Sequence, residues 1–172
     1  MIISLTGFKG AGKSSVAEAL GMLLETPVFD LDRLIEKEYG DIETLIYKEG
    51  EKHFRLIEFQ TLEELLFREK DNFILSLGGG TILNPESLGL IHNNTRCVYL
   101  DIPYEIALER IGNYRKYAIF SRCRNRGGIR RIYEKRLPLY EAAAEFKVDS
   151  YDRSIRETAV EIIHKLHSRV NP

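Results

Sequence analysis

The sequence is poor in cysteine and has no long apolar run. Its 172 residues include two cysteines, Cys97 and Cys123, too few for a disulfide framework, so we expect a reducing, cytoplasmic location. No apolar run is long enough to cross a membrane, and the N-terminus is typical of a core strand rather than a charged leader. We therefore exclude small disulfide-rich secreted proteins and membrane-spanning chains, and we expect one soluble domain over residues 1–172.

One local pattern carries chemistry on its own. Residues 7–14 read GFKGAGKS, which fits G-x-x-x-x-G-K-[ST]. An apolar run at 2–6 predicts a strand before it, and 15–24 predicts a helix after it. In that context backbone N–H groups and the helix N-terminus hold phosphate oxygens, Lys13 reaches the β- and γ-phosphates, and the Ser14 hydroxyl binds Mg²⁺. A chance match in a glycine-rich turn is the alternative, but the flanking elements favour binding of a nucleoside triphosphate.

Charge is segregated, although 25 basic residues nearly balance 26 acidic ones. From Arg110 to Arg136 there are ten Lys or Arg residues and one acid, Glu134. Such a block indicates a surface that meets an anionic ligand, and nucleic acid is one candidate. A solvated basic loop is the simpler alternative. Beside a phosphate-binding loop, we interpret the block as a flap that closes over a triphosphate.

Apolar runs that suit buried strands alternate with segments of helical periodicity. We predict strands at 2–6, 28–29, 73–77, 97–100 and, more weakly, 146–148. We predict helices at 15–24, 33–39, 43–48, 53–68, 85–92, 103–111, 129–145 and 154–168. This alternation indicates an α/β fold whose parallel sheet is covered by helices on both faces.

The segment 112–128 is polar, basic and bounded by glycines, and it lies between two predicted helices. These features predict a mobile lid, and disorder or a short irregular helix is the alternative. Its aromatic residues Tyr114, Tyr117 and Phe120 are expected to be exposed.

Two carboxylates, Asp30 and Asp32, follow the second predicted strand. Ligands of open α/β sheets bind beyond such strand ends, and side chains two apart in an extended chain point the same way. We therefore expect one carboxylate to serve the Mg²⁺ shell and the other to accept a substrate hydroxyl. The alternative is that Asp32 only caps a helix that begins at Arg33.

Glycines and arginines elsewhere narrow the substrate further. The run Gly78, Gly79 and Gly80 follows the third strand, where a backbone lying against a small polar ligand would need glycine; a tight turn is the alternative. Arg55 and Arg136 sit on separate predicted helices, and their planar donor forks match a carboxylate. Alternatively, Arg55 forms an ordinary surface ion pair with Glu58.

Taken in order, these motifs resemble the shikimate kinase family. The matching set is the GFKGAGKS loop, Asp-x-Asp after the second strand, Phe-Arg-x-x-Glu from Phe54, the glycine run after the third strand, and Arg-x-Pro-Leu-Tyr from Arg136. The set covers most of the chain. The resemblance implies a P-loop NTPase fold in three α/β/α layers, with a five-stranded parallel sheet in the order 2-3-1-4-5. It also implies a shikimate-binding segment around 31–60 and a lid around 112–128.

The resemblance further implies transfer of the ATP γ-phosphoryl group to the 3-hydroxyl of shikimate, with Mg²⁺, in aromatic amino acid biosynthesis through chorismate. It implies catalytic roles for Lys13 and Asp32. The implied shikimate-binding residues are Asp32, Arg55, Gly78, Gly79, Gly80 and Arg136. The implied ATP-binding residues are Gly10, Ala11, Gly12, Lys13, Ser14, Ser15, Arg110 and Arg153, and the metal-binding ones are Ser14 and Asp30. The resemblance implies a monomer, and we expect no nucleic-acid or membrane partner.

The predicted lid departs from the family, which usually carries Arg-Pro-Leu-Leu there. Residues 115–120 read RKYAIF, and aligning the apolar pair with Ile119 and Phe120 places Tyr117 in the arginine position. The phosphate-facing cation is then Lys116, which is nearest in sequence, or Arg115, which has the better donor geometry.

Three other functions stay open at this stage. Another small-molecule kinase of this fold, such as a gluconate kinase, would share the phosphate loop but would not need two arginines for a carboxylate. A non-catalytic, nucleotide-dependent RNA-binding module would use the basic block, but no stacking motif accompanies it. A degenerate kinase kept as a regulator would fit the altered lid but not the intact site residues.

Overall fold

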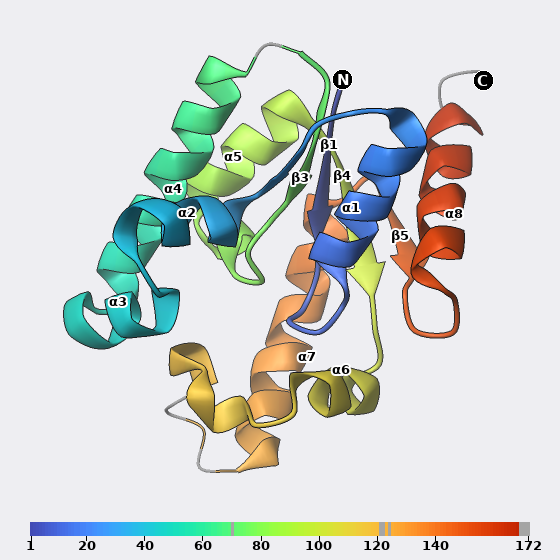
Figure 1. Cartoon of the computed structure of the whole chain (residues 1–172). Coiled ribbons are helices and arrows are strands. Elements are labelled where there is room, and N and C mark those ends of the chain that lie inside the picture. The colour runs from blue at the N-terminus through green and yellow to red at the C-terminus, as the bar shows by residue number, and fades with distance from the viewer. Residues whose placement is uncertain (70, 121–122, 124, 169–172) are drawn as a thin grey trace.

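The computed structural model describes residues 1–69, 71–120, 123 and 125–168. Its centre is a five-stranded, all-parallel sheet in the order β2-β3-β1-β4-β5, which confirms the predicted topology (Figure 1). The strands are β1 (Ile2–Thr6), β2 (Val28–Asp30), β3 (Phe73–Ser76), β4 (Thr95–Asp101) and β5 (Phe146–Asp149).

The middle of the sheet positions the phosphate-binding loop. Strand β1 lies between β3 and β4, and its residue Leu5 pairs with Ser76 on one side and Val98 on the other. The chain order reverses at this point, so the loop after β1 opens into the crevice where open α/β sheets bind ligands. Ile3 and Leu5 are fully buried, as expected for a strand covered on both faces.

Helices cover both faces of the sheet and complete the three predicted layers (Figure 1). Helices α1 and α8 pack against each other on one face, whereas α4, α5 and α7 lie on the other. The helices are α1 (Lys13–Leu24), α2 (Leu31–Tyr39), α3 (Ile42–Glu49), α4 (Glu51–Arg68), α5 (Pro85–Asn94), α6 (Tyr104–Ile111), α7 (Arg126–Ala143) and α8 (Ile155–Ser168). None of the described helices combines the length and apolarity that a bilayer crossing requires.

The N-termini of the helices differ in a way that bears on ligand binding. Helix α2 is capped by Asp30, whose carboxylate accepts from the Arg33 N–H at 3.2 Å, and α5 is capped by Asn84 with Pro85 in its first turn. Helix α1 begins after Gly12 with no side-chain cap. Its first N–H groups therefore stay available to an external anion.

The predicted lid is partly structured. Two short 3₁₀ turns, η2 (Tyr114–Lys116) and η3 (Ala118–Phe120), follow α6, and α7 begins at Arg126, so the end of the predicted segment 112–128 is helical. Ser121, Arg122 and Arg124 lie outside the described residues. The expected exposure of the aromatics is wrong. Phe120 is 1% exposed, with its ring centroid 6.0 Å from that of Phe8 in the phosphate loop, and Tyr114 and Tyr117 are half-buried against the core.

Candidate active site

The phosphate-binding loop adopts a backbone that only glycine accepts readily. Gly7, Gly10 and Gly12 have φ values of 145°, 89° and 86°, all in the positive region. The ammonium group of Lys13 folds over this loop and donates to the carbonyl of Gly7 at 2.9 Å and to that of Phe8 at 3.2 Å. Burial lowers the pKa of Lys13 to about 8, and the nearby Asp32 carboxylate opposes this shift. The buried ammonium group of Lys13 is therefore placed where a negatively charged ligand would stabilise it.

The two carboxylates after β2 have different positions, contrary to the expected extended arrangement. The strand ends at Asp30 and α2 begins at Leu31, so Asp32 occupies the first turn of a helix. The capping alternative for Asp32 is also wrong, because Asp30 caps α2. The other Asp30 oxygen accepts the Ser14 hydroxyl proton at 2.6 Å. Burial raises the pKa of Asp32, and the charge of Lys13 opposes the rise.

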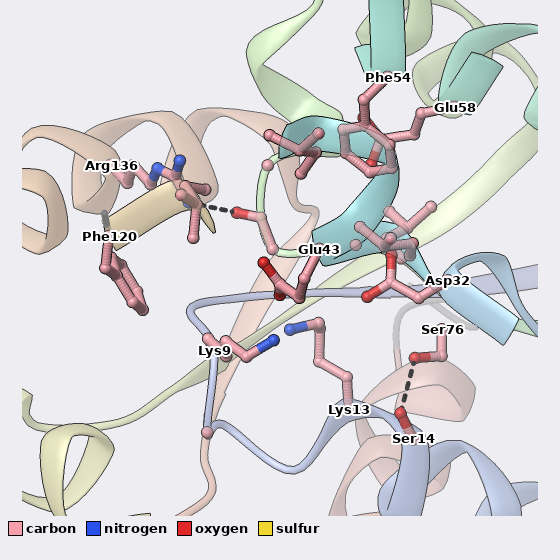
Figure 2. Close-up of a pocket in the computed structure, with 18 of the residues that line it drawn as sticks. Lys9, Lys13, Ser14, Asp32, Glu43, Phe54, Glu58, Ser76, Phe120 and Arg136 are labelled. Carbon is pink, nitrogen blue, oxygen red and sulfur yellow. Dashed lines mark hydrogen bonds between the residues drawn. The ribbon is translucent and has the colours of Figure 1, made fainter. Parts of the chain in front are cut away.

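A single cavity of about 350 Å³ brings together most of the predicted residues (Figure 2). Its walls come from the phosphate loop, α2, α3, α4, the β3–η1 turn, η3 and α7. The predicted site residues that line it are Gly10, Gly12, Lys13, Ser14, Ser15, Asp32, Arg55, Gly78, Gly79, Gly80 and Arg136. Ala11 is buried inside the loop, and Asp30 lies in an adjoining hollow on the far side of Ser14.

Arg55 is fixed from α4 by a buried acid. Its guanidinium donates to Glu58 at 2.7 Å, and the same carboxylate accepts the Thr81 hydroxyl proton at 2.6 Å. The predicted ion pair therefore exists, but Glu58 is fully buried and the pair lies in the cavity wall rather than on the surface. Burial raises the pKa of Glu58, whereas Arg55 opposes the rise. Glu58 thus positions the guanidinium at the cavity.

The glycine run is explained by close approach of side chains. A Cβ on Gly80 would lie 2.3 Å from the Arg55 Nη2, and one on Gly78 would lie 2.6 Å from a Glu58 oxygen and 2.8 Å from an Asp32 oxygen. None of the three glycines has a positive φ. Gly78 and Gly80 therefore let charged side chains pack against the backbone, and the expectation that the run also lies against a ligand stays a prediction.

Arg136 approaches the same turn from the opposite side. It lies in α7, is 7% exposed, and donates to the Gly79 carbonyl at 3.1 Å (Figure 2). The Tyr140 hydroxyl donates to the same carbonyl at 2.5 Å. Within the described part of the chain Arg136 has no carboxylate within ion-pairing distance, so its charge is directed at the cavity. Arg55 and Arg136 therefore converge on one space.

The remaining predicted cations lie outside this cavity. Arg110 is close to it, because its guanidinium donates to the Gly10 carbonyl at 3.2 Å and to the Ser150 carbonyl at 3.4 Å. Arg153 instead pairs with Glu161 of α8. Lys116 is exposed on η2 and does not line the cavity. Among the described residues of the basic block, Arg110 and Lys116 thus lie in different environments, and the flap stays a prediction.

Two charged cavity residues were missed by the sequence analysis. The Lys9 ammonium lies 3.8 Å from the centroid of the Tyr117 ring, and both Lys9 and Glu43 line the cavity. The Glu43 carboxylate accepts from the Ala118 N–H, which joins α3 to η3. Lys9 occupies a variable position of the GFKGAGKS motif and Glu43 lies on a polar helix, so no local signal marks either residue.

The Ser14 hydroxyl and the Asp30 carboxylate are the predicted metal donors, and they lie side by side. Among the described residues, no group of three or more His, Cys, Asp or Glu side chains could hold a metal ion. The Ser14 hydroxyl lies between Asp30 and the Ser76 hydroxyl, which is 3.4 Å away. Hydroxyl and carboxylate oxygens suit Mg²⁺, which takes few protein ligands and completes its shell with phosphate and water.

Comparison with known proteins identifies the family. The model of the family described as shikimate kinase matches residues 9–167. A curated shikimate kinase of Aquifex aeolicus is 34% identical, with 96% of each chain aligned, and one of Dictyoglomus turgidum is 31% identical, with 95% of this chain and 96% of the relative aligned.

Solved structures agree with this result. The shikimate kinase of Acinetobacter baumannii in complex with shikimate has a TM-score of 0.91 at 29% identity, and the alignment covers 99% of this chain and 95% of the other. A gluconokinase of Sinorhizobium meliloti has a TM-score of 0.61 at 18% identity, with 98% and 94% covered, and shares the fold. The chain therefore belongs to the shikimate kinase family, whose members are ATP-dependent kinases.

Proposed function

We propose that this kinase transfers the γ-phosphoryl group of ATP to the 3-hydroxyl of shikimate, giving shikimate 3-phosphate and ADP. The observation that carries the proposal is the convergence of Arg55 and Arg136 on the cavity that also contains Lys13 and Asp32. The two guanidinium groups suit a carboxylate, and the lysine suits a phosphate. The cavity thus has one end for each substrate.

The carboxylate of shikimate would lie between Arg55 and Arg136. Arg55 pairs with Glu58 at 2.7 Å and with Glu51 at 3.5 Å, but its planar guanidinium has further N–H donors for a carboxylate. Arg136 donates to the neutral Gly79 carbonyl. A carboxylate that joins two partly desolvated guanidinium groups forms charge-assisted hydrogen bonds, which are stronger than neutral ones. The backbone around Gly79 would contact the ring hydroxyls.

Asp32 would orient the acceptor hydroxyl and take its proton. The new bond joins the 3-oxygen of shikimate to the γ-phosphorus while the bond to the leaving oxygen of ADP breaks in line. Because burial raises the pKa of Asp32, its carboxylate is a better proton acceptor than an exposed aspartate. Phe120 and Ile119 of η3 line the cavity and would exclude water, the competing acceptor.

The phosphate end would be held by the N–H groups of residues 10–15, by Lys13 and by Mg²⁺ on Ser14, with Asp30 in support. The metal would supply positive charge to the β- and γ-phosphate oxygens. We propose that Arg110 borders the adenine, since it already contacts the loop at Gly10. Arg153 and Lys116 stay predictions for the nucleotide end, and neither lines the cavity.

We also propose that the enzyme works as a monomer in the cytoplasm, without a nucleic-acid or membrane partner. Size-exclusion chromatography with light scattering checks the first point: a single peak near 19.9 kDa is expected, and a stable dimer would contradict it. Arg110 contacts the phosphate loop and Arg136 lines the cavity, which supports a small anionic ligand as the partner of these two residues.

An acceptor screen tests the reaction. ADP release should depend on shikimate and should stay at background with gluconate or a nucleoside monophosphate. Arg136→Ala should raise the KM for shikimate by about 30-fold or more, because a desolvated carboxylate loses a charged partner, while the KM for ATP should change little. Lys135→Ala, at the exposed neighbouring position, is the control. Turnover with gluconate alone, or an unchanged shikimate KM in Arg136→Ala, would refute the assignment.

A further inference from the structure

We propose that Lys9 supplies the second cation on the γ-phosphoryl group, in place of the arginine that the family carries in its lid, and that Tyr117 positions it. This inference rests on the proposed phosphoryl transfer. In this arrangement the second positive charge comes from the phosphate loop, and the lid contributes the aromatic ring that holds the Lys9 side chain in place.

The position of Lys9 supports this role. Its side chain lines the cavity together with Lys13 and Asp32, and Figure 2 shows the ends of Lys9 and Lys13 directed toward the same part of it. Its backbone nitrogen would lie 3.6 Å from a Cβ on Gly79, which sets the residue beside the substrate turn. The Lys9 backbone therefore lies beside the substrate turn, and its charged side chain lines the same cavity as Lys13 and Asp32.

The charge of Lys9 is available to a ligand. Within the described residues no carboxylate lies within 4.0 Å of its ammonium group. Two ammonium groups that share one cavity repel each other, and the charge of Lys9 adds to the effect of burial in lowering the pKa of Lys13. A polyanion between them removes this repulsion, which is why the pair suits a phosphate better than a neutral hydroxyl.

A lid residue, Tyr117, contacts the Lys9 side chain. Tyr117, which takes the arginine position of the family motif, carries no charge, and its ring face lies 3.8 Å from the Lys9 ammonium. An aromatic face at this distance attracts a cation. Arg115 and Lys116 are exposed and do not line the cavity, and the Lys116 ammonium lies farther from the centroid of the Tyr117 ring than that of Lys9, at 5.0 Å.

Single variants separate Lys9 from the lid cations. Lys9→Met should lower kcat about 100-fold, the effect of losing one transition-state donor, with a change of less than about threefold in the shikimate KM. It should also weaken binding of a non-hydrolysable ATP analogue about tenfold by calorimetry and leave ADP affinity within about twofold, because only the γ-phosphate loses its partner. The same measurements on Arg115→Met and Lys116→Met compare the lid cations with Lys9, and the larger loss of kcat should belong to Lys9→Met. Lys48→Met, an exposed lysine on α3, is the control.

A rescue tests the replacement of the lid arginine. In the Lys9→Met background, Tyr117→Arg should recover at least about tenfold of the lost kcat, because the guanidinium returns to the position used by the family. Absence of recovery would overturn the replacement. A kcat unchanged in Lys9→Met, or a loss in Arg115→Met or Lys116→Met instead, would overturn the role of Lys9. Failure of the wild-type enzyme to phosphorylate shikimate would refute the proposed function. That outcome is distinguishable from failure of the Lys9 proposal, because it is measured without any variant.

Discussion

The Ser14 hydroxyl donates a 2.6 Å hydrogen bond to a carboxylate oxygen of Asp30 and thereby joins the first turn of α1 to the end of β2. The other Asp30 oxygen caps α2. The Asp30 carboxylate therefore orients Ser14, a proposed Mg²⁺ ligand, and also stabilises α2. A substitution at Asp30 that keeps the helix cap can test the role in metal binding.

Asp30→Asn should separate metal binding from folding. Asparagine is as good an N-cap as aspartate, so the unfolding free energy should stay within about 0.5 kcal/mol. The Mg²⁺ concentration for half-maximal activity should rise about tenfold, because a charged oxygen near the ion is lost. Asp41→Asn, which changes the cap of α3, is the matched control and should leave the Mg²⁺ dependence unchanged. Equal Mg²⁺ curves for the two variants would contradict the metal assignment.

Substitution by alanine should affect substrate binding at Gly80 and fold stability at Gly7. Gly80→Ala places a Cβ against the Arg55 guanidinium, which can move, so we expect the shikimate KM to rise at least about tenfold with a loss of unfolding free energy below about 1 kcal/mol. Gly7→Ala has a φ of 145° and meets the Leu100 carbonyl at 2.6 Å, so it should destabilise the fold by about 2 kcal/mol or more. Kinetics and urea denaturation check the pair. A Gly80→Ala enzyme with normal shikimate KM would show that Arg55 does not need its present position.

The pH profile should follow Lys13 on its alkaline side. Burial lowers the pKa of Lys13 to about 8, and the amine is uncharged above its pKa, so kcat/KM for ATP should fall as pH rises through about 8. Bound phosphates raise the pKa of Lys13, so the fall in kcat should occur at higher pH. Lys13→Arg retains the charge and should lose this alkaline fall, although with lower activity. An unchanged kcat/KM for ATP up to pH 9.5 would contradict a titrating Lys13.

The fall in activity at low pH should follow protonation of Asp32. Burial raises its pKa, and the carboxyl is neutral below its pKa, so kcat/KM for shikimate should fall as the pH drops through a value above the ordinary range of aspartate. Asp32→Asn should abolish both this limb and most of the activity. An acid limb that persists in the residual activity of Asp32→Asn would assign it to another group.

Glu43 should hold the lid segment closed. Its carboxylate accepts from the Ala118 N–H, so Glu43→Ala removes a bond between α3 and η3. We expect trypsin to cleave after Arg115 or Lys116 several-fold faster in this variant, since proteolysis tracks local opening. Saturating ATP and shikimate should slow the cleavage again. Glu49→Ala, at an exposed position of the same helix, should cleave at the wild-type rate, and equal rates in all three proteins would exclude the contact as a latch.

Local sequence was sufficient for the elements and for the phosphate loop. The positive φ values of Gly7, Gly10 and Gly12, and the adjacent Lys13 and Ser14, depend on neighbours within a few residues, so a linear pattern captures them. The helix boundary at Leu31 was less accessible. A capping aspartate and a strand-ending aspartate look alike in sequence, and the expected extended arrangement of Asp30 and Asp32 was wrong for that reason.

Contacts between distant segments were decided only by the tertiary structure. Residue chemistry and the family resemblance both pointed to Arg55 and Arg136, but their convergence depends on α4 and α7 packing around the same Gly79 turn. Three further contacts join segments that are far apart in the chain, so no local sequence pattern predicts them. They are the Glu58–Thr81 bond, the Lys9–Tyr117 contact and the Glu43–Ala118 bond. By itself, the sequence determined the parallel α/β fold and the phosphate loop, because backbone conformation and burial period are local properties. The folded chain decided which charges share the cavity, because side-chain proximity is set by how the helices pack onto the sheet.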